Sequence, residues 1–166
     1  MAGEQTNWKM ELPPNLPMPV FTSTEPWQSQ RVGALAIYCS DGRWGDAFDE
    51  FCHRSLLIPR YDRFAVPGGP AFLASAGGEP PGRGARGQLE FLARVHGIER
   101  IVLIAHHGCA FCLERCGGNE RDCLPAQIDD VKKAAQTLRG WFREIRTEGY
   151  LAMRSDNALS FHRLNL

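Results

Sequence analysis

The strongest constraint on the fold is the run of five consecutive apolar residues at 101–105, IVLIA. It has the length of one strand, and it lacks the polar alternation of a strand with one face in water. Strands of this kind are typical of parallel sheets that are covered on both faces. A second apolar run, VGALAIYC at 32–39, also has the length of a buried strand. The two runs predict the centre of a parallel sheet.

Helical patterns separate the predicted strands along the chain. Apolar residues at helical spacing predict helices over 46–57, over 88–96 with an end at Gly97, and from about 126 to 147. Further strands are predicted at 63–66, ended by Pro67 and Gly68, and as two short segments within 150–164. This alternation predicts an α/β fold, a mostly parallel central β-sheet flanked by helices, with an antiparallel edge at the C-terminus.

The chain length predicts one domain. A chain of 166 residues, 43% of them hydrophobic, can build one well-buried core and is short for two. Residues 1–30 are rich in proline and polar residues, which predicts an extended, irregular N-terminal arm before a single α/β domain at 31–166. Trp8, Val20, Phe21 and Trp27 could attach this arm to its own domain or to a neighbouring subunit. The Gly- and Pro-rich segment 77–87 predicts a mobile loop.

Charge and composition restrict the class of partner. Lys plus Arg equals Asp plus Glu at 19 each, so there is no basic surplus to favour a nucleic acid or an anionic membrane. A small-molecule substrate or a protein partner fits better. No apolar stretch reaches the roughly 20 residues that span a bilayer, and the polar start lacks a secretory pattern. We therefore expect a cytoplasmic protein whose six cysteines are free thiols, metal ligands or redox groups.

Metal-ligating side chains follow both apolar strands. Cys39 ends the first, and His106 and Cys109 follow the second. Because ligands of parallel sheets bind at the carboxyl ends of the strands, the two segments should converge. Zinc is held by cysteine and histidine, and catalytic sites use three protein ligands and leave one position open. The pattern predicts a zinc site in the 31–166 domain. In the alternative interpretation, Cys39 is only a small buried residue, and Asp41 and Arg43 form an ion pair that stabilises a turn.

These motifs resemble those of the β-class carbonic anhydrases. The family places Cys-x-Asp-x-Arg and His-x-x-Cys after apolar strands, and this chain has CSDGR at 39–43 and IVLIAHHGC at 101–109. The segments YDRFAV and GQLEFLARVHGIER are similar to family segments in order and spacing, so the resemblance runs from about residue 32 to residue 116. The chain departs from the family at 67–70, where PGGP replaces an Arg-Asn-Ala-Gly-type stretch.

The resemblance implies a zinc enzyme for the reversible hydration of carbon dioxide to bicarbonate by a zinc-bound hydroxide. It implies one Zn²⁺ per chain, held by Cys39, His106 and Cys109. Asp41 would accept a hydrogen bond from the zinc-bound water, and Arg43 would hold Asp41. In some family members the aspartate instead moves onto the metal and closes the site. The family pairs its subunits, so a homodimer or a multiple of dimers is expected.

Two other functions stay open from the sequence. The same chemistry could act on a related molecule, carbonyl sulfide or carbon disulfide. Alternatively, the chain could be a non-catalytic zinc-binding protein, which predicts four protein ligands and loss of the fold on chelation.

The remaining cysteines also allow two interpretations. Cys112, Cys116 and Cys123 could form a second metal or redox site, or the first two could line the core while Cys123 is a loop thiol.

Overall fold

The computed structural model describes residues 13–75 and 84–166. The chain divides into two units between Gln30 and Arg31. Residues 13–30 contain no helix or strand and are exposed, including Val20, Phe21 and Trp27. Trp8 and most of the loop predicted at 77–87 lie outside the described residues.

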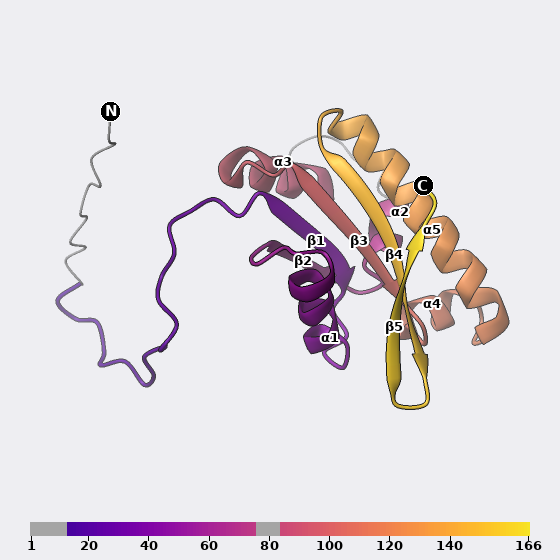
Figure 1. The fold of residues 1–166 in the computed structure, drawn as a ribbon, viewed down its shortest axis with the longest axis horizontal. Helices are drawn as coiled ribbons and strands as arrows, with labels where there is room; N and C mark the ends of the chain where they lie inside the picture. The colour runs from indigo at the N-terminus through magenta and orange to yellow at the C-terminus, as the bar shows by residue number, and fades with distance from the viewer. Residues whose placement is uncertain (1–12, 76–83) are drawn as a thin grey trace. The chain divides into compact units, whose positions relative to one another are not determined.

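The second unit is built on a five-stranded sheet in the order β2-β1-β3-β4-β5 (Figure 1). Its strands are β1 (Ala34–Cys39), β2 (Asp62–Val66), β3 (Arg100–His106), β4 (Arg146–Ser155) and β5 (Ala158–Leu164). The pairs β1–β2, β1–β3 and β3–β4 are parallel, and β4–β5 is antiparallel. The predicted α/β class, with a mostly parallel sheet and an antiparallel edge at the C-terminus, is confirmed.

Helices cover both faces of this sheet. They are α1 (Gly45–Glu50), continued by the π-helical turn η1 (Phe51–Ser55), then α2 (Pro70–Ala74), α3 (Ala85–His96), α4 (Ala110–Arg115) and α5 (Glu120–Trp141). Within the described part of the chain, none of them has the length and apolar character needed to cross a membrane.

The central strands contribute side chains to two separate cores, because successive side chains point to opposite faces of a sheet. On one face, Leu35 and Ile37 of β1 pack with Leu103 of β3 and with buried residues of α2, α3 and α5. On the other face, Ala36 and Tyr38 pack with buried residues of α1 and η1. Because both faces are covered, the sequences of β1 and β3 are apolar without interruption. The packing on both faces also holds the ends of these two strands at the same edge of the sheet.

The long helix differs from its prediction at both ends. It begins at Glu120, six residues before the predicted start, because the Asn119 side chain caps it by accepting from the Arg121 amide at 3.1 Å. Pro125 therefore lies inside the helix. It ends at Trp141 instead of 147, because Arg146 and Thr147 join β4 and pair with β3.

Two shorter differences concern the region after β2. The helix α3 begins at Ala85, so the last three residues of the predicted 77–87 loop are helical. The short helix α2 was not predicted, because Pro67, Gly68 and Gly69 indicated only a turn. Pro70 is its first residue, a position where proline loses no helical hydrogen bond.

Candidate metal centre

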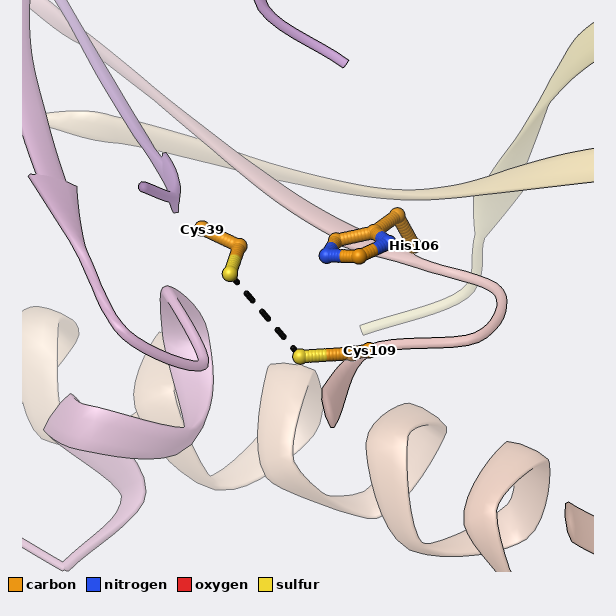
Figure 2. A group of neighbouring side chains, drawn as sticks. All are labelled: Cys39, His106 and Cys109. Atoms are coloured by element: carbon orange, nitrogen blue, oxygen red, sulfur yellow. Dashed lines mark hydrogen bonds between the residues drawn. The ribbon is translucent and has the colours of Figure 1, made fainter. Parts of the chain in front are cut away.

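Three metal-ligating side chains meet at the carboxyl edge of the sheet. Cys39 is the last residue of β1, His106 is the last residue of β3, and Cys109 is the N-cap of α4. Their donor atoms all lie within 4.8 Å of one another, and all three residues are buried. Figure 2 shows the two sulfurs and the imidazole ring converging from these separate elements. The structure thus brings together the three residues that the sequence predicts as zinc ligands.

The turn between β3 and α4 places the last two donors. His106 is still in the strand, and Cys109 has extended backbone before the helix. Gly108 between them has φ +69°, in the left-handed region that glycine adopts without strain. A tight turn, and not a shared helix face, therefore aims both side chains at Cys39.

A second turn, after β2, contacts Cys39 through its backbone. Gly69 has φ +53°, and a Cβ added there would lie 2.7 Å from the Cys39 nitrogen and from the Tyr38 carbonyl carbon. The turn therefore approaches β1 more closely than any side chain allows. The departure at 67–70 thus places a glycine turn directly against the strand end that carries Cys39.

The hydrogen bonds of His106 fix its tautomer. Its Nδ1 donates to the His107 carbonyl oxygen at 3.0 Å, which leaves the lone pair on Nε2. Nε2 is buried and has no hydrogen-bond partner. Trp44 packs against the ring with a centroid distance of 4.9 Å. A buried acceptor without a partner is costly, so this nitrogen is suited to a metal ion.

The two thiols interact directly, with 3.8 Å between the Cys39 and Cys109 sulfurs. The hydrogen bond from the Cys109 thiol has the largest effect, and it lowers the pKa of Cys39 to about 4 against the opposing effect of burial. The same bond, together with burial, raises the pKa of Cys109. One proton thus leaves the pair readily, and the resulting thiolate is the form that binds metals.

This donor set fits a zinc ion. With Zn–S bonds of about 2.3 Å and tetrahedral angles, two thiolates on one ion lie about 3.8 Å apart. The Cys39–Cys109 separation of 3.8 Å matches that value. No fourth histidine, cysteine or acidic residue among those described places a donor atom within this mutually close set. The group could therefore hold a metal with three protein ligands and one open position.

Asp41 is paired with Arg43 beside this set. The Arg43 Nε lies 2.9 Å from Oδ1 and its Nη2 lies 2.5 Å from Oδ2, a bidentate arrangement. The hydrogen bond from Arg43 lowers the pKa of Asp41 to about 2. Asp41 is largely covered whereas Arg43 is exposed. The carboxylate is thus ionised near neutral pH, and it is held by the guanidinium.

A cavity of about 320 Å³ opens next to these groups. Its lining includes Arg43 and Trp44, which follow β1, and His107 and Gly108, which follow β3. Both segments that carry the candidate ligands therefore border the cavity. It is large enough for a small molecule and several waters.

One contact near the centre was not predicted. The Gln127 side-chain amide of α5 donates to the His106 carbonyl oxygen at 2.6 Å, and Gln127 is buried. It thus ties the end of β3 to the long helix. Asp130, one turn further along α5, is a second buried polar residue of the same helix.

The structure resembles solved β-carbonic anhydrases, whereas no protein-family model and no curated protein sequence matches the chain. The β-carbonic anhydrase isoform I of Trichomonas vaginalis is 12% identical with a TM-score of 0.52, covering 87% of this chain and 90% of that one. The Aspergillus fumigatus β-carbonic anhydrase CafA is 17% identical, with coverages of 80% and 76% and a TM-score of 0.45. The β-carbonic anhydrase CcaA is 14% identical, with coverages of 82% and 79% and a TM-score of 0.46. By the first of these comparisons, which aligns most of both chains, the molecule has a β-carbonic anhydrase-like fold.

Proposed function

We propose that the chain is a zinc-dependent carbonic anhydrase that hydrates carbon dioxide reversibly. One observation carries the proposal: Cys39, His106 and Cys109 present three close donors, including an unpartnered buried Nε2, with no fourth protein donor among the described residues. Three protein ligands with an open position are characteristic of catalytic zinc, whereas structural zinc is closed by four. The fold and the resemblance of the two motifs support the same activity.

A bound zinc ion would supply a Lewis acid that lowers the pKa of a water molecule from about 15.7 to about 7. The chain's own part is to hold and orient. Asp41 stays ionised and can only accept hydrogen bonds, so it is suited to orienting a water proton. Arg43 fixes the direction of that carboxylate through two hydrogen bonds.

The Asp41–Arg43 pair also bears on the non-catalytic alternative. A structural zinc site would need a fourth protein ligand, and Asp41 is the nearest acidic residue in sequence to Cys39. Its carboxylate is instead engaged by Arg43 and does not belong to the close donor set. This arrangement favours catalysis over a closed, structural centre.

The proposal has three further parts. Residues 31–166 form the catalytic unit, with one zinc ion at the centre of Cys39, His106 and Cys109, and residues 1–30 are an arm. The protein works in the cytoplasm on a small-molecule substrate. It assembles as a homodimer or a multiple of dimers, as the resemblance implies.

The test is the initial rate of carbon dioxide hydration by zinc-loaded protein, measured by stopped flow between about pH 6.5 and 9. We expect a rate that rises through one ionisation and is lost in Cys39→Ser. The matched control is Cys52→Ser, because Cys52 is also buried but lies in the core beside α1. It belongs to neither of the two groups of described side chains that could hold a metal ion. It should keep the full rate.

Two results would overturn parts of the proposal. A zinc-loaded protein without hydration activity at any pH would exclude a carbonic anhydrase. Turnover of carbonyl sulfide or carbon disulfide by that protein would then retain the zinc enzyme and change the substrate. Equal activity in Cys39→Ser would separate the reaction from this centre.

A further inference from the structure

A second group of three thiols lies outside the candidate metal centre. The sulfurs of Cys112, Cys116 and Cys123 are all within 4.8 Å of one another. Cys112 and Cys123 are buried, and Cys116 is half-buried. Cys123 lies inside α5, whereas one of the two interpretations of the sequence makes it a loop thiol. The interpretation of Cys123 as a loop residue is therefore wrong.

The local fold builds this group from two helices. Cys112 and Cys116 are four apart on one side of α4, where residues at this spacing are neighbours. The chain then turns through Gly117 and Gly118, which have φ of +64° and +81°. The Asn119 cap starts α5, and Cys123 falls in its first turns, facing back to α4. The early start of α5 is thus what brings the third sulfur to the other two.

The distances suit a shared metal ion better than a disulfide. The Cys112 and Cys116 sulfurs are 3.9 Å apart, and all six cysteines are free. A disulfide needs about 2.05 Å. Thiolates around one zinc ion, at Zn–S of about 2.3 Å, lie about 3.8 to 4.0 Å apart in tetrahedral or trigonal geometry. The observed separation falls in that interval without any movement of the helices.

The surroundings of the three sulfurs favour neutral thiols until a metal binds. Burial raises the pKa of Cys112 and of Cys123, and the neighbouring cysteines add to this effect at Cys112. Arg115 on the same helix is already paired with Asp130. No fourth histidine, cysteine or carboxylate of the described residues has an atom in the close set. The half-buried side at Cys116 leaves room for a solvent ligand.

We propose that Cys112, Cys116 and Cys123 bind a second Zn²⁺ through three thiolates, with water as the fourth ligand. Each thiol that is protonated gives up its proton when the metal binds. The ion links α4 to α5. Because Cys112 lies in the first turn of α4, directly after the Cys109 N-cap, the ion also fixes the helix start that carries Cys109. The site does not depend on the proposed hydration activity.

Zinc stoichiometry of the full chain tests the site directly. Protein purified with a thiol reductant, loaded with zinc and dialysed should hold about two zinc ions per chain. Cys116→Ser should hold about one, since this half-buried residue is the ligand whose change disturbs packing least. Cys39→Ser should also hold about one, and the double variant should hold none. Cys52→Ser is the matched control and should keep both ions.

The outcomes separate the two sites. If Cys116→Ser and wild type hold the same amount of zinc, the second site is wrong whatever the first site does. If Cys39→Ser matches wild type while Cys116→Ser loses an ion, the second site stands and the zinc ligands of the proposed function fail. Far-ultraviolet circular dichroism of each variant shows whether it is folded, and Cys116→Ala replaces Cys116→Ser if it is not.

The absorption spectrum of bound cobalt tests the second site without a measurement of zinc stoichiometry. Cys39→Ser protein loaded with Co²⁺ should show thiolate-to-metal charge-transfer absorption from the second site alone. The absorption should be absent from the variant that also carries Cys116→Ser. Absorption of equal strength in both variants, or none in Cys39→Ser, would overturn the proposal.

Discussion

At the residue scale, Asp41 and Arg43 form an ion pair in which Arg43 lowers the pKa of Asp41. The carboxylate accepts two short hydrogen bonds from a single guanidinium. Its pKa is consequently held at about 2, far from the pH at which the proposed reaction would run. Asp41 is thus a fixed acceptor, and any pH dependence near neutrality must come from another group.

Removing the guanidinium tests this pairing. In Arg43→Ala, we expect the hydration rate to fall about 10- to 100-fold, the usual effect of losing a group that orients a ligand at a metal site. The pKa of Asp41 should rise from about 2 toward its ordinary value of about 3.9, as an NMR pH titration would show. Arg154→Ala is the matched control because Arg154 borders the same cavity. A full rate in Arg43→Ala would exclude an orienting role.

Gly69 allows a second test at this scale. A Cβ there would meet the backbone of Tyr38 and Cys39 at 2.7 Å, and its φ of +53° is strained for other residues. We expect Gly69→Ala to lower the free energy of unfolding by at least about 1–3 kcal/mol and to weaken zinc binding. Urea denaturation and zinc titration measure the two effects. Gly140→Ala, on an open surface of α5, should leave both unimpaired.

At the scale of elements, the sequence predicts strands and helices that have a clear local pattern of apolar residues. It does not predict element boundaries that depend on contacts with distant parts of the chain. The strands β1 and β3 were predicted because both of their faces are covered, so their apolar runs are continuous. The predicted start of α5 was wrong because the Asn119 cap lies earlier than the apolar stripe on which the prediction depended. Its end was missed because Arg146 pairs with β3, a contact that no local pattern reveals.

The same division applies to the candidate site. Cys39, His106 and Cys109 could be placed together from the sequence, because parallel strands end at one edge. The close approach of Gly69 to the backbone of Cys39 could not, since it depends on a turn that follows a different strand. The free Nε2 of His106 also required the structure, because the tautomer follows from the hydrogen bond to the His107 carbonyl.

Glu148 gives a prediction for the element β4. It is buried and accepts from Arg100 of β3 at 2.6 Å, with Arg146 and Arg163 nearby. Burial alone would raise the pKa of Glu148, but these arginines outweigh burial and lower it. The stabilisation is therefore complete above the unfolded pKa of about 4.3. It is lost as pH falls through the lower folded pKa.

We expect Glu148→Gln to lower the free energy of unfolding at pH 7 by about 1–3 kcal/mol, because it leaves the half-buried guanidinium of Arg100 without its carboxylate partner. The variant should also lose less stability than wild type as pH falls below about 5. Urea denaturation between pH 3 and 7 measures both. Glu50→Gln, which removes an exposed pair with Arg54, should change stability by less than about 1 kcal/mol. Parallel pH curves for wild type and Glu148→Gln would contradict the argument.

At the scale of the whole molecule, the first prediction concerns assembly. The outer strand β5 is largely exposed, and several large apolar side chains are exposed as well, among them Leu57, Phe91 and Leu159. With a chain mass of 18.5 kDa, analytical ultracentrifugation should give twice that mass or an even multiple of it. A mass of 18.5 kDa across the concentration range would contradict the proposed dimer.

Chelation separates the catalytic and structural interpretations of the proposed metal. The two main cores, on opposite faces of the sheet, contain neither His106 nor Cys109. The sheet and its large helices should therefore persist when zinc is removed by EDTA, with an unchanged far-ultraviolet spectrum. The melting temperature should nevertheless fall, because a ligand that binds only the folded state stabilises it.

The control for this experiment is EDTA already saturated with Zn²⁺ at the same ionic strength, which accounts for salt effects on the melting temperature. Adding zinc back to the chelated protein should restore both the melting temperature and the hydration rate. If chelation instead unfolds the chain, the metal supplies folding free energy, as in domains whose core is too small without it. That result would contradict a fold held by its two cores, and it would favour the non-catalytic zinc protein.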